Sequence, residues 1–600
     1  MEENSERAIP FRSKWTRLVA AGTAVVAIST LISVSIVVPK KDGPDLPESV
    51  IQETVETRIS TEKVLRGLDS PYRYDCQSHD CSELDNYVWA DNDGYSWEIL
   101  EKNSSALGGT TYIVNMTSQY WLTEAEVNRN LWWHELILAI PDEYDSDLHG
   151  SGFLYVHWAS NKKNGAITSE AYEMADKMMH RARTTKTIVA CVRQVPNQPL
   201  FFEDDPRAEE FPKGRTEDDV IAFGWRKFVE KPEHDAKWLV HIPMTKAARV
   251  AIDAVDEIYE HVKSDFSHGS VGKIDKFCVG GGSKRGWTTW LIASVDKRVK
   301  CATPAVLDCL SLKQQFINWY KNLGAWSFAL EPYWSENLTD YIYHPAFDQL
   351  QIEIDPISYA DRLTMPILVI SATGDEFFAP DDSYEYFDKL VGDNKYLRLL
   401  PNTEHTTRQG LLQVMSSPDT TQAIRALYLQ TMKNYRQPKV SWERFVRENG
   451  NSVVKLSTDV TPTSIVGFYA ESSNSTRRDF RMISLDPDYV DWDNVQGDAD
   501  SQSRRKFIRE HLPKEGSNPI YPFMFQGAKW KTSMVRHVGN NEYILEIPQA
   551  AEGYRAAMIQ VSFPGPDNRS DFTVTSEVMI TPDSRPFKMC VDPNCRSFLI

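Results

Sequence analysis

The sequence contains no internal repeat, no low-complexity tract and no long run of charges of one sign. These absences argue against solenoid and propeller folds and against a disordered chain, all of which depend on repeated or biased segments. Positive charge is in deficit, since 66 lysine and arginine residues face 84 aspartate and glutamate residues, for a net charge of -18. Because a phosphate backbone repels such a surface, we expect no nucleic-acid partner.

Motifs for metal and phosphate binding are also missing. The sequence has no HExxH, no EF-hand loop and no CxxC zinc spacing, so it predicts neither a metal site nor a bound cofactor. The phosphate-loop pattern GxxxxGK[ST] is absent, and the dinucleotide pattern GxGxxG, laid from Gly280, meets Arg285 where its last glycine belongs. Nucleotide-dependent chemistry therefore has no support in the sequence.

The chain begins with a segment typical of membrane proteins. Residues 18–38 carry no charge, and a helix of that length, at ~1.5 Å per residue, matches the ~30 Å hydrocarbon core of a bilayer. Basic residues precede this segment and acidic residues dilute those that follow it, so the positive-inside rule leaves residues 1–17 in the cytosol. We expect a type II signal anchor with the rest of the chain outside the cytosol. A cleaved signal peptide, which would give a secreted protein, is the alternative.

The remaining length is enough for more than one core, because single cores rarely grow beyond roughly 250 to 300 residues. After a polar stalk at 39–60, residues 61–445 alternate short apolar runs with helix-like stretches, which predicts an α/β domain. Residues 446–600 change to short alternating segments and predict a smaller β-sandwich-like domain. In the first domain a helix is expected at 245–262, and strands are expected at 111–114, 136–140, 153–157, 187–192, 277–279, 301–307, 367–371 and 396–400.

Cysteines and glycosylation sequons suit an oxidising compartment. Two close pairs, Cys76 with Cys81 and Cys590 with Cys595, predict local disulfides. Cys278 lies inside a predicted strand, so we expect an unpaired core residue there. Candidate glycosylation sequons begin at Asn103, Asn115, Asn337, Asn474 and Asn568.

The segment FCVGGGSKRGWTTW at 277–290 predicts a nucleophile elbow, in which a serine stands on a sharp turn between a strand and a helix. Ser283 is at the tip, and Gly280, Gly281 and Gly282 supply the small residues that the close approach of strand and helix needs. The usual signature is GxSxG, whereas here the final glycine is delayed by one position to Gly286. We therefore expect Ser283 to be the nucleophile of an α/β-hydrolase fold.

The partners of such a serine follow in the order acid, then histidine, each after a strand. Asp375 follows the strand expected at 367–371, and His405 follows the next strand, so we predict Asp375 as the acid and His405 as the general base. Asp308, which ends the preceding strand, is the alternative acid, and Glu376, Asp381 and Asp382 are further competitors.

The oxyanion hole of this arrangement uses the backbone N–H of the residue after the nucleophile, here Lys284, and one from the loop after an earlier strand. In that loop His157, Trp158 and Ala159 are candidates, of which we choose Trp158. The positive charges of Lys284 and Arg285 could bind an acidic substrate group or pair with nearby carboxylates. For Arg285 we expect pairing.

At these motifs the chain resembles the PhoPQ-activated pathogenicity-related protein family, which includes the autocrine proliferation repressor A proteins. The resemblance covers roughly residues 60 to 590 and implies an α/β-hydrolase-like serine enzyme related to prolyl and dipeptidyl peptidases, with Ser283, Asp375 and His405 as its triad. The blocks that carry it are GGSKRGWTTW, VPNQPL, TEDDVIAFGW, PMTKAA, GDEFFAPDDS, PNTEH, RRDFRM and TPDSRPF.

The sequence therefore predicts a serine hydrolase outside the cytosol that cleaves peptides through an acyl-enzyme. A carboxylesterase is one alternative. A cell-surface or secreted signalling protein that uses the hydrolase scaffold for binding is another, because a fold alone does not decide function.

Overall fold

The computed structural model of the protein describes residues 67–589 and 599–600, apart from 78, 80, 92–93, 107, 162–166, 232–234, 406–416, 486–522 and 568. These residues belong to one compact unit, Glu56–Ile600. Within the described part of the chain, no helix is both long and apolar enough to cross a bilayer. The predicted anchor at 18–38, with residues 1–17 before it and the stalk at 39–60 after it, lies outside the described residues.

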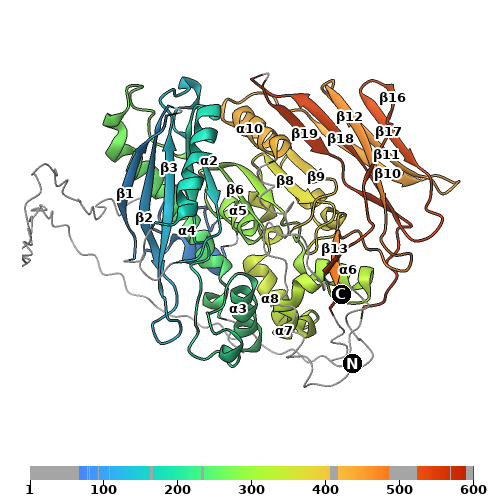
Figure 1. The fold of residues 1–600 in the computed structure, drawn as a ribbon, viewed down its shortest axis with the longest axis horizontal. Coiled ribbons are helices and arrows are strands. Elements are labelled where there is room, and N and C mark those ends of the chain that lie inside the picture. The colour runs from blue at the N-terminus through green and yellow to red at the C-terminus, as the bar shows by residue number, and fades with distance from the viewer. Residues whose placement is uncertain are drawn as a thin grey trace, which may run out of the picture. The chain divides into compact units, whose positions relative to one another are not determined.

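One mixed sheet dominates the fold (Figure 1). Its first part is antiparallel from β1 (Ser96–Ser104) to β5 (Ile188–Val192), and the strands from β5 to β9 (Lys395–Leu400) in the sheet order are parallel. Every strand that we predicted in the α/β part is present, whereas β1 was missed because only one of its residues is buried and its sequence forms no apolar run. In sheet order these strands are β1 (Ser96–Ser104), β2 (Thr110–Tyr120), β3 (Leu131–Ile140), β5 (Ile188–Val192), β4 (Ser151–Val156), β6 (Lys276–Gly282), β7 (Val299–Ala305), β8 (Ile367–Ala372) and β9 (Lys395–Leu400).

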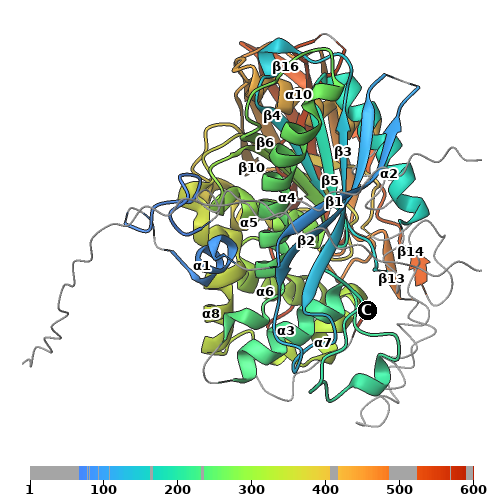
Figure 2. The same cartoon turned by 90° about the vertical axis from the view of Figure 1, so that its left-hand side faces the viewer.

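Helices cover both faces of the parallel strands, which explains why these strands read as continuous apolar runs. Successive side chains of a strand point to opposite faces. On β4, Leu154 and Val156 therefore join the hydrophobic cluster under α4 (His241–Val262), while Phe153 and Tyr155 join the cluster under α2 (Ser169–Thr185). Figure 2 shows α4 and α2 on opposite sides of the strands. The helix predicted at 245–262 is confirmed within α4.

The first cluster also contains residues of α1 (Glu83–Trp89), α3 (Asp218–Glu230), α5 (Lys284–Val295), α6 (Leu312–Leu323), α7 (Glu331–Ser335) and α8 (Pro345–Ile354). The second contains α10 (Pro418–Met432). Thus α2 and α10 share one face of the sheet, and the helices that surround the elbow share the other.

The C-terminal segment adds strands to the same sheet and builds a small antiparallel sheet beside it. Thr575 pairs with Leu397 of β9, so the main sheet runs across the boundary that we expected at residue 445. The added strands are β19 (Asp571–Thr575), β18 (Arg555–Pro564), β12 (Ser464–Glu471) and β15 (Lys531–Ser533), with β20 (Met579–Thr581) paired to β18. The small sheet consists of β10 (Val440–Val446), β11 (Ser452–Thr458), β17 (Glu542–Ile547) and β16 (Arg536–Gly539), and β13 (Ile483–Leu485) pairs with β14 (Phe523–Phe525).

Two disulfides lie among the described residues. The predicted Cys76–Cys81 bridge is present. The expectation that Cys278 is unpaired is wrong, because the parallel pairing of β6 and β7 places it opposite Cys301, with 4.5 Å between their Cα atoms and a bond between their sulfurs. This register is not visible in the sequence. Cys590 and Cys595 lie outside the described residues.

The predicted sequons differ in their accessibility. Asn103 on β1 and Asn474 after β12 are exposed, whereas Asn115 and Asn337 are half-buried and their side-chain oxygens are enclosed. Asn568 lies outside the described residues. Asn103 and Asn474 are therefore the better placed acceptors, and glycosylation itself stays a prediction.

Candidate active site

Ser283 stands between the end of β6 and the first residue of α5, as the elbow motif predicts. Its φ of 55° and ψ of -130° lie in a region that residues with a side chain rarely adopt. The turn is held because the Ser283 N–H donates to Ala305 O at 2.8 Å. A Cβ on Gly281 would lie 2.6 Å from Arg285 O, and one on Gly286 would lie 2.8 Å from Ala305 O. The delayed glycine thus permits the close approach of α5 to β7.

The sheet topology brings the elbow to a position where ligands commonly bind. Successive parallel strands add on one side from β4 to β5 and on the other side from β6 to β9, so the order reverses between β4 and β6. In open α/β sheets, crevices form outside the carboxyl ends of strands at such a reversal. Ser283 follows the carboxyl end of β6 and therefore lies directly beside this reversal.

The structure brings Ser283, His405 and Asp375 together in one chain of contacts. Nε2 of His405 lies 2.9 Å from Oγ of Ser283, and Nδ1 of His405 lies 2.8 Å from Oδ2 of Asp375. The other oxygen of Asp375 accepts the backbone N–H groups of Phe377 at 2.7 Å and Phe378 at 3.1 Å. These hydrogen bonds in the turn after β8 fix the orientation of the carboxylate that faces the imidazole. Asp375 and His405 are both buried.

The environment of His405 favours its charged form. Burial lowers the pKa of His405, but the charge of Asp375 and its hydrogen bond raise that pKa by more, and the net shift is upward. Glu376 accepts the backbone N–H of His405 at 2.7 Å. Burial, together with the charges of Asp375 and Glu404, raises the pKa of Glu376 to about 8. The upward shift reflects the cost of placing a second negative charge beside Asp375 in a buried site.

The alternative acids do not contact the His405 ring. Asp308 accepts hydrogen bonds from Ser371 Oγ at 3.1 Å and from Tyr386, so it is held behind the site. Burial raises the pKa of Asp308 to about 7. Among the other competitors, Asp381 pairs with Arg478, and Asp382 accepts the N–H of Ala379.

The loop after β4 supplies the candidates for the second oxyanion donor. The N–H of His157 donates to Val192 O at 2.8 Å, which removes it from the candidates. No described residue accepts a hydrogen bond from the backbone N–H of Lys284, Trp158 or Ala159. Lys284 together with Trp158 therefore stays a prediction, with Ala159 as the neighbouring choice.

The two cations that follow the nucleophile are paired, as expected for Arg285. Both terminal nitrogens of Arg285 contact the carboxylate of Glu217 at 2.6 and 2.7 Å, and Lys284 Nζ lies 2.8 Å from Glu217 and 3.1 Å from Asp218. Burial opposes ionisation of Glu217, but Arg285 and Lys284 together lower its pKa well below the usual range. These pairs tie α3 to the elbow helix and leave little net charge for an acidic substrate group.

A narrow cavity of about 50 Å³ opens beside Ser283. A water-sized group needs about 10 to 15 Å³ on such a measure, so the space admits only a few heavy atoms. Asp218 on its wall accepts from Tyr333 at 3.0 Å and is paired with Lys284, so the wall carries a balanced charge. Its aromatic lining consists of Trp225, Trp287, Phe316, Trp319, Tyr333, Phe377 and Phe378. The cavity therefore suits a small, neutral, apolar group.

Sequence reasoning missed the roles of Glu217 and Glu376 as partners of the site. Glu376 was considered only as an alternative to Asp375, although it binds the backbone of His405. Glu217 has a positive φ of 52° before α3, and no local pattern connects it to Arg285, which is 68 residues away. Neither contact has a sequence signal, because each depends on how segments that are separated in the sequence pack together.

Comparison with known proteins identifies relatives of the chain. The model of the PhoPQ-activated pathogenicity-related protein family matches residues 84–481. The autocrine proliferation repressor protein A of Dictyostelium discoideum is 28% identical over 520 residues, which are 85% of this chain and 92% of that protein.

Solved structures match more distantly. The acetyl xylan esterase 1 of Thermoanaerobacterium sp. JW/SL YS485 covers 59% of this chain and 94% of its own, with a TM-score of 0.34 and 13% identity. The acylaminoacyl peptidase of Pyrococcus horikoshii covers 58% of this chain and 50% of its own, with a TM-score of 0.31 and 12% identity. Likeness at this level says nothing about substrate.

Proposed function

This chain belongs to the PhoPQ-activated pathogenicity-related protein family, and we propose that it is a serine hydrolase that forms an acyl-enzyme on Ser283. The observation that carries the proposal is the pair of contacts that His405 makes, 2.9 Å to Ser283 Oγ and 2.8 Å to Asp375 Oδ2. A base within hydrogen-bond reach of a nucleophile, itself oriented by a third group, is the arrangement that activates a serine.

The proposed reaction starts with Ser283 Oγ attacking a substrate carbonyl. His405 takes the Ser283 proton at Nε2 while its Nδ1–H donates to Asp375, which stabilises the imidazolium. The oxyanion is stabilised by the N–H of Lys284 and by one from the loop at Trp158. His405 then gives its proton to the leaving group, the carbonyl re-forms and the leaving-group bond breaks. Water repeats the sequence on the acyl-enzyme and releases Ser283.

We propose peptides as the substrate class, of the kind that prolyl and dipeptidyl peptidases cleave, with carboxylic esters as the alternative. The small apolar cavity beside Ser283 supports a compact group next to the scissile carbonyl. A proline ring and a short acyl chain both meet that requirement. The choice between them rests on rates with matched peptide and ester substrates.

We further propose that the enzyme acts outside the cytosol, held by the segment at 18–38 or secreted after cleavage. The Cys76–Cys81 disulfide, which lies in a half-exposed loop, supports an oxidising compartment.

A growth-regulating role as a binding protein is the second candidate. The observation that favours it is the 28% identity with the autocrine proliferation repressor protein A over 85% of this chain. In that case the biological effect would survive the loss of Ser283 Oγ, because a binding surface does not need the nucleophile.

The experiment that tests the proposal is labelling of the folded ectodomain with a fluorophosphonate probe, followed by a panel of peptide and ester substrates. We expect Ser283→Ala to abolish both labelling and hydrolysis. Ser294→Ala is a matched control, because Ser294 lies in the same helix and its hydroxyl donates only to Leu291 O. Folded wild-type protein that neither reacts with the probe nor hydrolyses any substrate would contradict the proposal and favour the binding role.

A further inference from the structure

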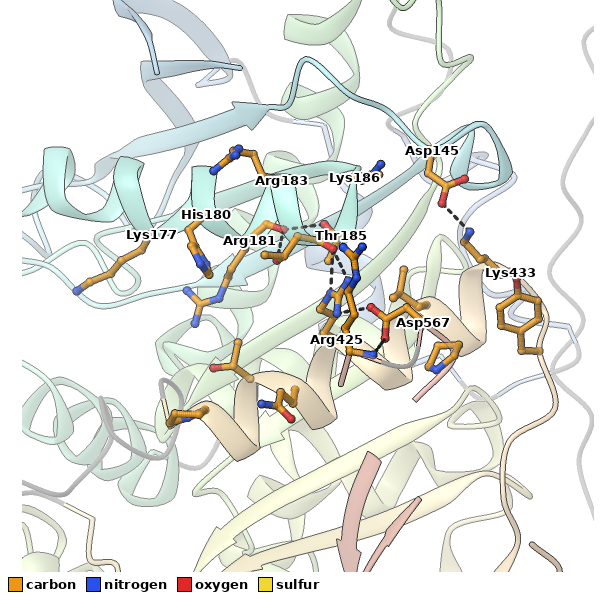
Figure 3. Close-up of a pocket in the computed structure, with 18 residues that line it drawn as sticks. Asp145, Lys177, His180, Arg181, Arg183, Thr185, Lys186, Arg425, Lys433 and Asp567 are labelled. Carbon is orange, nitrogen blue, oxygen red and sulfur yellow. Dashed lines mark hydrogen bonds and ion pairs between the residues drawn. The ribbon is translucent and has the colours of Figure 1, made fainter. Parts of the chain in front are cut away.

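A second hollow, of about 1000 Å³, lies between α2 and α10 (Figure 3). Its volume is at the upper end of the ~300 to 1,000 Å³ typical of small-molecule sites. It shares no lining residue with the cavity beside Ser283. We call it the α2–α10 hollow.

The charge of the α2–α10 hollow is opposite to that of the whole chain. Against a net charge of -18 for the protein, its lining holds seven lysine and arginine residues and one histidine but only two aspartates. The basic residues are Lys177, His180, Arg181, Arg183, Lys186, Arg425, Lys433 and Arg569, and the acidic ones are Asp145 and Asp567. A concave surface of one sign focuses its field and concentrates ions of the other sign.

The two aspartates are already used as partners. Asp145 lies 2.6 Å from Lys433 Nζ, and Asp567 pairs with Arg425, whose guanidinium also donates to Thr184 O at 2.5 and 2.9 Å. The bonds from Arg425 to Thr184 hold α10 against the end of α2, so residues that line the hollow also stabilise its walls.

Among the remaining basic residues, Lys186 pairs with Glu143, a residue outside the lining, at 2.9 Å. No carboxylate of a described residue lies within ion-pair distance of Lys177, His180 or Arg569. Arg181 lies over the ring of Tyr155, with its guanidinium carbon 4.6 Å from the ring centroid. Figure 3 shows that Lys177, His180 and Arg181 extend from α2 on the side of α10, while Arg183 and Lys186 extend the other way.

We propose that the α2–α10 hollow binds a small polyanion that carries several phosphate or sulfate groups. The cations are spread along the hollow instead of meeting at one point, so a ligand with several anionic groups uses them better than a single ion does. Arginine pairs with phosphate and sulfate oxygens through two parallel N–H bonds, and lysine adds a compact charge. A phosphorylated small molecule and a sulfated saccharide share this chemistry.

Isothermal titration calorimetry of the full chain tests the proposal with inositol hexakisphosphate and sucrose octasulfate as the two sources and inorganic phosphate as the minimal probe. We expect at least one polyanion to bind, more tightly than inorganic phosphate, and more weakly as salt is raised. The Lys177→Ala/Arg569→Ala double variant should weaken binding at least about tenfold, which is the cost of losing a single charge-assisted contact.

Two control variants separate the hollow from general charge effects. Lys276→Ala removes one exposed cation that lines neither cavity and should leave the affinity unchanged within about twofold. Lys177→Arg keeps the charge and should retain binding. Because Lys177 and Arg569 are exposed, their removal leaves the melting temperature unchanged. Absence of binding by every probe, or equal affinities in the wild type and the double variant, overturns the proposal.

Discussion

Replacement of Asp375 by asparagine tests the proposed base most directly. The asparagine side chain would have nearly the same volume, and its carbonyl oxygen could still accept the N–H groups of Phe377 and Phe378. Its NH₂ group would then face Nδ1 of His405, where Oδ2 of Asp375 lies at 2.8 Å. A donor at that position favours the tautomer with the proton on Nε2, and that nitrogen cannot accept a proton from Ser283.

The expected loss follows from this wrong tautomer. The same change in a serine protease triad lowers kcat by about 10⁴-fold, which corresponds to about 5.4 kcal/mol of transition-state free energy at 1.36 kcal/mol per tenfold. Because both backbone hydrogen bonds to residue 375 persist, we expect folding to be nearly unaffected. The loss should therefore appear in the chemical step and not in the amount of folded protein.

The assay compares Asp375→Asn with Asp308→Asn as its matched control. Asp308 accepts hydrogen bonds from Ser371 and Tyr386, and His405 bonds to Asp375 instead. Burial raises the pKa of Asp308 to about 7, so its carboxyl carries only part of a full charge near neutral pH. Rates of fluorophosphonate labelling and of p-nitrophenyl acetate hydrolysis should fall about 10⁴-fold in the first variant and less than about tenfold in the second. Equal losses in both variants, or more than a tenth of the activity in Asp375→Asn, would refute the reasoning.

Burial lowers the pKa of His405, but Asp375 raises it by more, so the imidazole keeps its proton at pH values above 6.5. Labelling and hydrolysis should therefore be lost as the pH falls through a midpoint above 6.5. A midpoint at or below 6.5 would contradict this prediction. Trp319→Leu widens the cavity beside Ser283, so the hexanoate-to-acetate rate ratio of p-nitrophenyl esters should rise about tenfold or more; an unchanged ratio would show that the acyl group lies elsewhere. Glu135→Gln leaves the buried guanidinium of Arg193 without its counter-charge. This should lower the free energy of unfolding by about 3 kcal/mol and shift the urea midpoint to a lower concentration. An unchanged midpoint would show that the protein does not need that charge.

The site shows why local patterns predicted its residues but not their supports. Ser283, Asp375 and His405 each follow a strand with a strong apolar signal, and the turn after a buried strand is a local feature that spacing can reveal. Glu217 reaches Arg285 from a different element, and the tie of α3 to the elbow helix appears only when both elements are placed.

The same distinction holds for the sheet. Apolar runs predicted the strands from β2 to β9, because strands covered on both faces need such runs. Only one residue of β1, Trp97, is buried, and the strand gave no such signal. The bridge between Cys278 and Cys301, and the pairing of Thr575 with Leu397, depend on register between strands that are far apart in sequence.

By itself the amino-acid sequence determined the fold class, the elbow and the order of its partners, because hydrophobic periodicity and glycine-rich turns are properties of short segments. Only the tertiary structure decided which carboxylate faces His405, which cations are neutralised and which gather in the α2–α10 hollow. Those outcomes depend on distances between side chains from separate elements, and packing sets these distances only after the chain has folded.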